Sequence, residues 1–186
     1  ADATPGSLIE FRRGAGPRVV CVHPAGGTAF CYLPLAEHLP ADAGLHGIQS
    51  PGVNPGEDVL PTVEAMAEEY LRLLGPMDDG PVVLTGLSYG GLVAHRMGEI
   101  LGRAGRRDVS VVLLDTQATD DAAARAAISS VDEAEFRDKL VRFNGMYPGI
   151  SDAQIERYLR LYNHNRSTAR EYLPAPSPTR LVLAQA

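Results

Sequence analysis

Tryptophan is absent from this 186-residue chain, lysine occurs once and cysteine occurs twice. No apolar run approaches the roughly 18 residues of a membrane-spanning helix, so we expect no association with a membrane. The net charge of −6 does not indicate the basic surface that proteins use to bind nucleic acid, so we do not expect nucleic acid as a partner. The first residues, ADATPGSLIEF, lack the apolar segment of a secretory signal peptide and have the composition of a linker end.

The two cysteines, Cys21 and Cys31, do not form a Cys-x-x-Cys pair. Cys21 lies inside the apolar run RVVCV, which predicts a buried, apolar role for its side chain. Sparse cysteine is typical of a reducing compartment, and we expect a cytoplasmic location. The sequence shows no metal-ligand pattern, so we expect neither a metal nor a bound cofactor.

The length allows one domain with a substantial core. Short apolar runs bounded by glycine and proline predict strands, and the segments between several of them have helical patterns. The expected strands are 7–11, 18–22, 44–50, 81–86, 108–115 and 180–186, and the expected helices are 30–39, 63–74 (capped by Thr62) and 89–101. This alternation, with strands that are apolar throughout, predicts an α/β fold with a mostly parallel sheet flanked by helices.

The pattern changes between residues 116 and 175, which are helical, charged and without a strand-like run. Ser130 and Ser151 each begin a capping-box pattern that opens a helix. The apolar face of the first helix would carry Phe136, Leu140 and Phe143, and that of the second Ile155, Tyr158, Leu159 and Tyr162. We therefore predict a single domain over 1–186, with a core of 7–115 and 176–186 and a helical lid of 116–175.

The segment TGLSYGG contains Gly86-Leu87-Ser88-Tyr89-Gly90, which matches the G-x-S-x-G nucleophile elbow. The pattern occurs by chance in many proteins, but here a buried strand precedes it and a helix follows. A catalytic serine needs this strand-to-helix turn, and the helix N-terminus stabilises a developing oxyanion. We predict that Ser88 is the nucleophile; the alternative is a non-catalytic Gly/Ser turn.

An oxyanion hole requires two backbone N–H donors, one from the residue after the nucleophile and one from a loop after an early strand. Tyr89 and Ala25, in the loop VHPAGG, meet these requirements, although the glycines could simply make a turn. Asp115 ends the strand after the nucleophile helix, where an aspartate can orient a histidine and stabilise its charged form. The alternative for Asp115 is a helix-capping or loop-start role.

The general base is the one member of the catalytic triad for which the sequence offers no clear candidate. In this fold the triad follows the order Ser, Asp, His, and of the five histidines only His164 comes after Asp115. His164 lies about 180° around its helix from Ile155, which predicts a solvated position. His23 lies in the proposed oxyanion loop, where we expect it to shape the turn. We therefore expect the last strand, the histidine loop and a final helix of the fold beyond Ala186.

Five segments in order resemble one family: VCVHPAGG, LHGIQSPGV, TVEAMAEEYLRLL, GPVVLTGLSYGGLVAHRM and VVLLDTQAT. Together they are similar to the thioesterase domains of nonribosomal peptide and polyketide synthases, which are α/β-hydrolases. The resemblance extends over residues 8–184. It implies a domain that takes an acyl or peptidyl chain from the phosphopantetheine arm of an upstream carrier domain and releases it by hydrolysis or cyclisation.

The resemblance supports Asp115 as the triad aspartate. Stand-alone editing thioesterases are also similar to this chain but place the aspartate one strand later, so an editing enzyme or another serine esterase remains an alternative. A third possibility is a non-catalytic module that holds carrier-bound chains. If the lid restricts water, removing residues 120–170 should raise hydrolysis relative to cyclisation.

Overall fold

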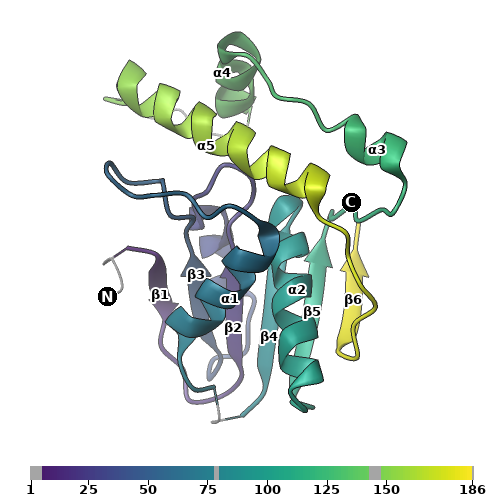
Figure 1. The fold of residues 1–186 in the computed structure, drawn as a ribbon. Coiled ribbons are helices and arrows are strands. Elements are labelled where there is room, and N and C mark those ends of the chain that lie inside the picture. Colours follow the sequence, from purple (N-terminus) through teal and green to yellow (C-terminus); the bar gives the residue numbers. More distant parts are fainter. Residues whose placement is uncertain (1–5, 78–79, 143–147, 186) are drawn as a thin grey trace.

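The computed structural model of the protein describes residues 6–77, 80–142 and 148–185. A six-stranded sheet has the order β1-β3-β2-β4-β5-β6, in which β1 is antiparallel to β3 and the other pairs are parallel (Figure 1). The strands are β1 Leu8–Arg12, β2 Arg18–Val22, β3 Gly44–Ile48, β4 Val82–Leu87, β5 Val109–Leu114 and β6 Arg180–Ala184. The mostly parallel α/β sheet predicted from the sequence is confirmed.

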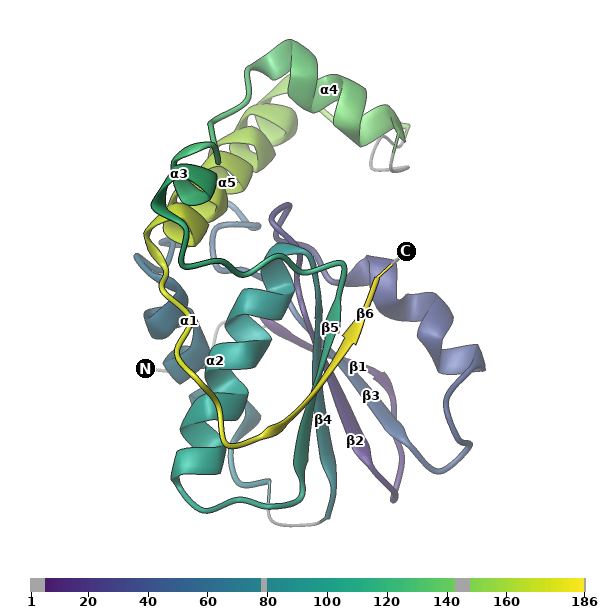
Figure 2. The ribbon, with the colours of Figure 1, turned by 90° about the vertical axis from the view of Figure 1, so that its right-hand side faces the viewer.

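Helices cover the two faces of the sheet unequally. α1 (Val63–Leu74) and α2 (Tyr89–Arg103) pack on one face, and the 3-10 helix η1 (Phe30–Glu37) lies against the other (Figure 2). Alternate residues of β2 supply the two cores, Val20 and Val22 toward α1 and α2, and Val19 and Cys21 toward η1. Both faces of this central strand are therefore buried, which explains its continuous apolar sequence.

The local signals in the sequence account for the ends of α1. The Thr62 hydroxyl accepts a hydrogen bond from the N–H of Ala65 at 3.0 Å, and Gly75 ends the helix with a φ of 64°. Segment 30–39 is helical as expected, but as a 3-10 helix from Phe30 to Glu37. Pro34 lies inside it and has no N–H to donate, which disfavours a regular α-helix there.

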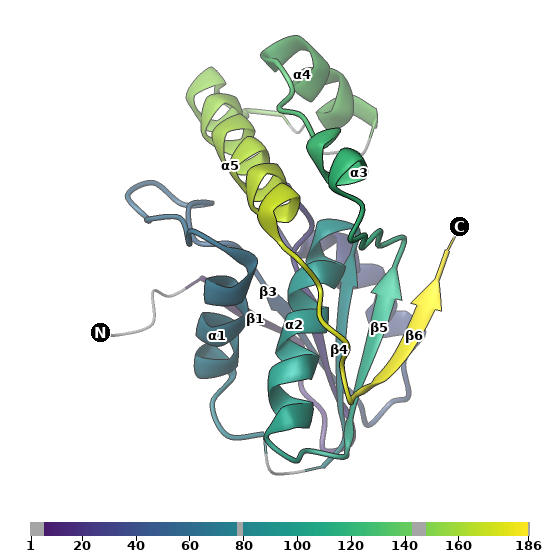
Figure 3. The ribbon, with the colours of Figure 1, turned by 45° about the vertical axis from the view of Figure 1, so that its right-hand side comes forward.

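Three helices, α3 (Ala122–Ala126), α4 (Glu133–Arg142) and α5 (Asp152–Glu171), lie beyond the carboxyl ends of the parallel strands (Figure 3). α4 and α5 share a small apolar cluster of their own, centred on Val131, Phe136 and Ile155. Leu140, Tyr158, Leu159 and Tyr162 pack around this cluster as predicted, whereas Phe143 lies outside the described residues.

The two predicted capping boxes have different outcomes. At Ser151 both reciprocal hydrogen bonds with Gln154 are present, so this box is confirmed. Ser130 does not cap α4: the Asp132 carboxylate accepts from the N–H of Glu135 at 2.9 Å instead. Asp132 is itself a good capping residue and lies immediately before the first helical residue, so it takes the position.

β6 forms the edge of the sheet, bonded to β5 on one side, and all five of its residues are exposed. Cys21 is fully buried, as predicted, and burial raises the pKa of its thiol to about 12. Among the helices in the described parts of the chain, none combines the length and apolar character needed to cross a bilayer.

Candidate active site

Ser88 lies on a strained turn between β4 and α2. Its φ of 52° and ψ of −116° are outside the regions that residues other than glycine ordinarily adopt, and its side chain is exposed although most residues on either side are buried. The Ser88 N–H donates to the carbonyl oxygen of Leu114 at 2.8 Å, which ties the turn to β5. The geometry presents a serine hydroxyl at the N-terminus of α2, as the sequence predicts.

Two glycines make this turn sterically possible. A Cβ atom on Gly86 would lie 2.0 Å from the carbonyl carbon of Gly90, and one on Gly90 would lie 2.4 Å from the carbonyl oxygen of Val22. In both cases the obstructing atom belongs to the backbone and cannot rotate away. The glycine positions of the motif are therefore fixed by the close approach of α2 to β2 and β4.

Thr116 is a part of this turn that sequence reasoning missed. Its buried hydroxyl lies 3.0 Å from the Ser88 carbonyl oxygen and 3.4 Å from that of Gly86. A Cβ on Gly91 would overlap the Thr116 hydroxyl, so that glycine makes room for it. The only signal available in the sequence was the position of Thr116 directly after Asp115.

Asp115 occupies the carboxyl end of the strand beside the nucleophile strand. Leu87 and Leu114 are paired across β4 and β5, so the residues that follow them, Ser88 and Asp115, leave the sheet side by side. Asp115 is exposed, has a φ of 44° and donates its N–H to the carbonyl oxygen of Ala184 at 2.9 Å. The topology thus brings the predicted nucleophile and the predicted carboxylate to one edge of the sheet.

The loop with the first predicted oxyanion donor also begins at this edge. Val22 pairs with Gly86 across β2 and β4, and the loop that follows Val22 contains Ala25. The loop is closed by a hydrogen bond from the Gly27 N–H to the Pro24 carbonyl oxygen at 2.9 Å. Tyr89 is the first residue of α2, where backbone N–H groups have no partner within the helix. Both predicted donor residues therefore border the Ser88 turn.

His23 is built into the core below this loop. Its ring Nδ1 lies 2.8 Å from the Pro24 carbonyl oxygen, which can only accept, so Nδ1 carries the proton and Nε2 accepts from the Tyr70 hydroxyl at 2.7 Å. Complete burial lowers the His23 pKa to about 4. The expectation that His23 shapes the turn fits these contacts, which occupy both ring nitrogens.

The prediction that His164 is solvated is wrong. His164 is half-buried, and its Nε2 lies 2.7 Å from the carbonyl oxygen of Leu60, because α5 also packs against the loop before α1. Among the described residues, no hydrogen bond connects Ser88 with any of the five histidines. Besides His23, the side chains of three histidines interact elsewhere: His95 with Tyr172, His164 with Leu60 and His46 with Glu10.

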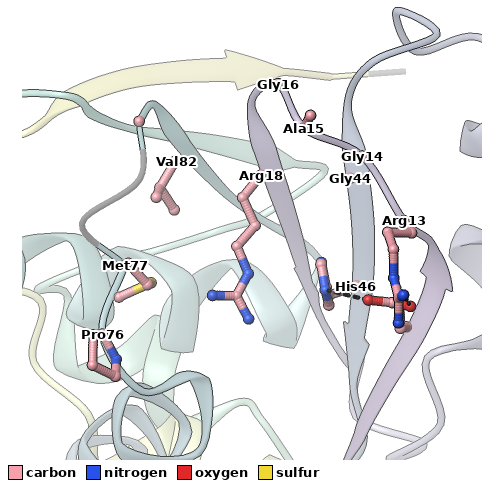
Figure 4. Close-up of a pocket in the computed structure, with 12 residues that line it drawn as sticks. Arg13, Gly14, Ala15, Gly16, Arg18, Gly44, His46, Pro76, Met77 and Val82 are labelled. Atoms are coloured by element: carbon pink, nitrogen blue, oxygen red, sulfur yellow. Dashed lines mark hydrogen bonds and ion pairs between the residues drawn. The ribbon is translucent and has the colours of Figure 1, made fainter.

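A cavity of about 330 Å³ lies at the opposite end of the sheet (Figure 4). Arg18, Gly44 and Val82, the first residues of three parallel strands, line it, whereas Ser88 follows the last residue of β4. Figure 4 shows the Arg18 guanidinium and the His46 ring extending into this region. Because it is at the amino ends of the strands, this cavity is separate from the candidate active site.

The sheet order, the helices on its faces and the strained serine between β4 and α2 define an α/β-hydrolase fold. A family model described as "Thioesterase domain" matches residues 17–182. The chain belongs to this family.

Individual proteins and solved structures are also similar to this chain. Malpinin synthetase from Mortierella alpina is 35% identical over 107 residues, which make up 57% of this chain and 1% of that protein. The NocB thioesterase domain, solved as a covalent complex with a fluorophosphonate nocardicin G analogue, has a TM-score of 0.76 and 26% identity over 96% of this chain and 76% of that one. The type II thioesterase BorB, from the borrelidin biosynthetic cluster, has a TM-score of 0.74 and 19% identity and covers 100% of this chain and 79% of that one.

Proposed function

We propose that this domain is a chain-releasing thioesterase with Ser88 as its nucleophile. The observation that carries the proposal is the strained, exposed Ser88 at the N-terminus of α2, in a chain that belongs to the thioesterase family. In this proposal Asp115 orients the general base, and the N–H groups of Ala25 and Tyr89 form the oxyanion hole. The proposal assigns the general base to a histidine that Asp115 orients at the carboxyl edge of the sheet.

The chemistry divides into two steps. The Ser88 hydroxyl oxygen attacks the thioester carbonyl, its proton passes to the base, and the carbon–sulfur bond breaks to release a thiolate. A thiol has a pKa of about 8.5, so the leaving group needs little help from a general acid. The thiolate then takes the proton from the base, which is free to act again. In the second step the base removes a proton from water or from a nucleophile of the chain itself, which attacks the serine ester; the ester C–O bond breaks, and the base returns the proton to the Ser88 oxygen.

The relatives support a proposal for the substrate class. Malpinin synthetase carries the similar segment within a far longer protein, and the NocB domain was solved with an analogue of nocardicin G. We infer that the acyl or peptidyl chain arrives as a thioester on the phosphopantetheine arm of an upstream carrier domain, and that no metal or bound cofactor takes part. Helices α3 to α5, which lie beyond the carboxyl edge that carries Ser88, are the proposed lid over the bound chain.

An editing thioesterase is the second candidate, because the likeness to BorB, a type II enzyme, extends over the whole chain. Such an enzyme would remove short or aberrant acyl groups from carriers. A general serine esterase would instead act on free small esters.

Steady-state kinetics on three substrates separates these functions. We expect kcat/KM to be highest for a peptidyl thioester on a carrier domain, lower for an acetyl thioester on the same carrier, and lowest for a free ester. A preference for the acetyl carrier would favour editing, and equal activity on the free ester would contradict the carrier-dependent function.

A further inference from the structure

Helix α5 has a second buried face that the lid role does not explain. Leu161, Asn165 and Thr168 recur at helical spacing, Tyr172 follows directly after the helix, and each of the four is at most 4% exposed. This face points toward the domain core, whereas the apolar face centred on Ile155 packs against α4. Two of these core-facing residues are polar, and both contact residues of the proposed oxyanion hole.

Asn165 holds the loop that contains Ala25, one of the two proposed oxyanion donors. Its Nδ2 donates to the Ala25 carbonyl oxygen at 2.9 Å, and the residue is completely buried. Leu161, about one turn earlier on α5, packs closely against the same loop, because a Cβ on Gly27 would lie 2.5 Å from a Leu161 methyl group. The peptide that follows Ala25 is thereby fixed, and with it the direction of the neighbouring Ala25 N–H.

Thr168 contacts the side chain of Tyr89, the other proposed oxyanion donor. Its hydroxyl donates to the Asn165 carbonyl oxygen at 2.8 Å and lies 2.7 Å from the Tyr89 hydroxyl, which also lies 3.1 Å from the Met66 sulfur. The Tyr89 ring also lies beside the His23 ring, with 6.0 Å between centroids, below the same loop. One helix therefore contacts both residues whose N–H groups face the developing oxyanion in the proposed reaction.

We propose that Asn165 and Thr168 are positioning residues that hold the oxyanion hole in its active shape, so that the hole forms only when α5 is docked. This inference rests on the proposed roles of Ala25 and Tyr89. Removal of one oxyanion donor typically lowers turnover by roughly 10²–10³. Because loss of a positioning contact displaces a donor without removing it, we expect a smaller decrease of about 10-fold. Displacement of α5 would then lower acyl transfer while the lid is open.

Substitutions at Thr168 distinguish positioning from packing. Thr168→Val keeps the volume and removes the hydroxyl, whereas Thr168→Ser keeps the hydroxyl and removes a methyl group. With the native full-length protein, we expect the rate constant for labelling of Ser88 by a fluorophosphonate to fall about 10-fold in Thr168→Val and to stay within twofold in Thr168→Ser. The reverse order would show that packing matters and would overturn the proposal.

A matched pair of asparagines tests the other contact. Asn163 lies on the same helix, and its side chain makes two hydrogen bonds of 2.9 Å with the backbone of Val131, within the lid itself. We expect Asn165→Ala to lower kcat about 10-fold on a carrier-bound thioester with KM little changed, and Asn163→Ala to leave kcat within twofold. Equal effects of the two substitutions on kcat would overturn the proposal.

The controls separate this inference from the proposed function. If the unmodified protein is not labelled at Ser88, the proposed function fails and the positioning role fails with it. If Ser88 is labelled and both Thr168→Val and Asn165→Ala react at the unmodified rate, only the positioning role is wrong. Circular dichroism and thermal melting confirm that each variant is folded, and the Thr168 pair remains decisive if Asn165→Ala does not fold.

Discussion

At the scale of single residues, the candidate active site depends on side chains that the reacting atoms never touch. Ser88 and Asp115 both have positive φ angles, and neighbouring hydrogen bonds hold them there. The Thr116 hydroxyl bonds the carbonyl of Ser88 itself. Backbone strain of this kind persists only where the surroundings enforce it, so these contacts are a condition for an exposed, reactive serine.

Thr116→Val tests this support. The substitution keeps the shape of the buried side chain and removes its donor, so we expect a loss of about 1 kcal/mol in the free energy of unfolding, measured in urea. Labelling of Ser88 should also slow. Thr119→Val, three residues along, is the control: its hydroxyl accepts from the N–H of Asp121 in an exposed turn. If Thr116→Val matches this control in both measurements, the supporting role is refuted.

His23 predicts a dependence of stability on pH. Its folded pKa of about 4 lies below the ordinary value of 6.5, so between these two values the unfolded chain binds a proton that the folded chain does not. The contribution of His23 to the free energy of unfolding is therefore complete above pH 6.5. It is lost as the pH falls toward 4, which lowers the free energy of unfolding by about 3 kcal/mol. Burial also lowers the pKa of His46 and of His95, which adds a loss of the same sign.

Urea unfolding at pH 7 and pH 4.5 measures this loss. His23→Asn should be less stable at pH 7 and should lose less stability between the two values than the unmodified protein. An unchanged pH dependence in the variant would show that His23 is not responsible.

At the scale of elements, the strands and most helices could be predicted because their signals are local. Thr62 and Ser151 act within a few residues of the chain, and the G-x-S-x-G pattern can be read from five consecutive residues. The core-facing side of α5 could not be predicted, because Asn165 and Thr168 have the composition of a solvated face. Their partners, Ala25 and Tyr89, are 140 and 79 residues away in sequence. The same long-range packing explains why His164 is not solvated.

The close packing of α2 against β2 predicts that a side chain at Gly90 would destabilise the domain. Gly90→Ala would place a Cβ 2.4 Å from the Val22 carbonyl oxygen and 2.6 Å from that of His23. We expect a loss of about 3 kcal/mol in the free energy of unfolding, because the backbone must move. Gly26→Ala is the control, since its Cβ would meet no atom within 4 Å. Equal stability of these two variants would contradict the packing described.

At the scale of the whole molecule, the domain has a core on the sheet and a separate cluster between α4 and α5. The division between core and lid, which the change in sequence pattern indicates, stays a prediction. Phe136 is 3% exposed, and its ring centroid lies 5.3 Å from that of Tyr162. The cluster can therefore be loosened without touching the sheet, and removal of residues 120–170 is a poor test because it would also remove the contacts that α5 makes with the core.

Phe136→Ala is the sharper test of the lid. Hydrogen exchange should become faster in α4 while β2 and β4 keep their protection, because the change creates a cavity in the lid cluster alone. If the lid restricts water, the share of hydrolysis over cyclisation should rise. Faster exchange throughout the sheet, or an unchanged product ratio despite a loosened α4, would contradict the proposed lid role.

The most direct test of the account is the site of acylation. The native protein is incubated with a fluorophosphonate or a carrier-bound acyl thioester, digested, and its peptides are analysed by mass spectrometry. The account predicts one covalent adduct, on Ser88, that is absent from Ser88→Ala. An adduct that persists in Ser88→Ala, or that maps to another residue, would contradict it.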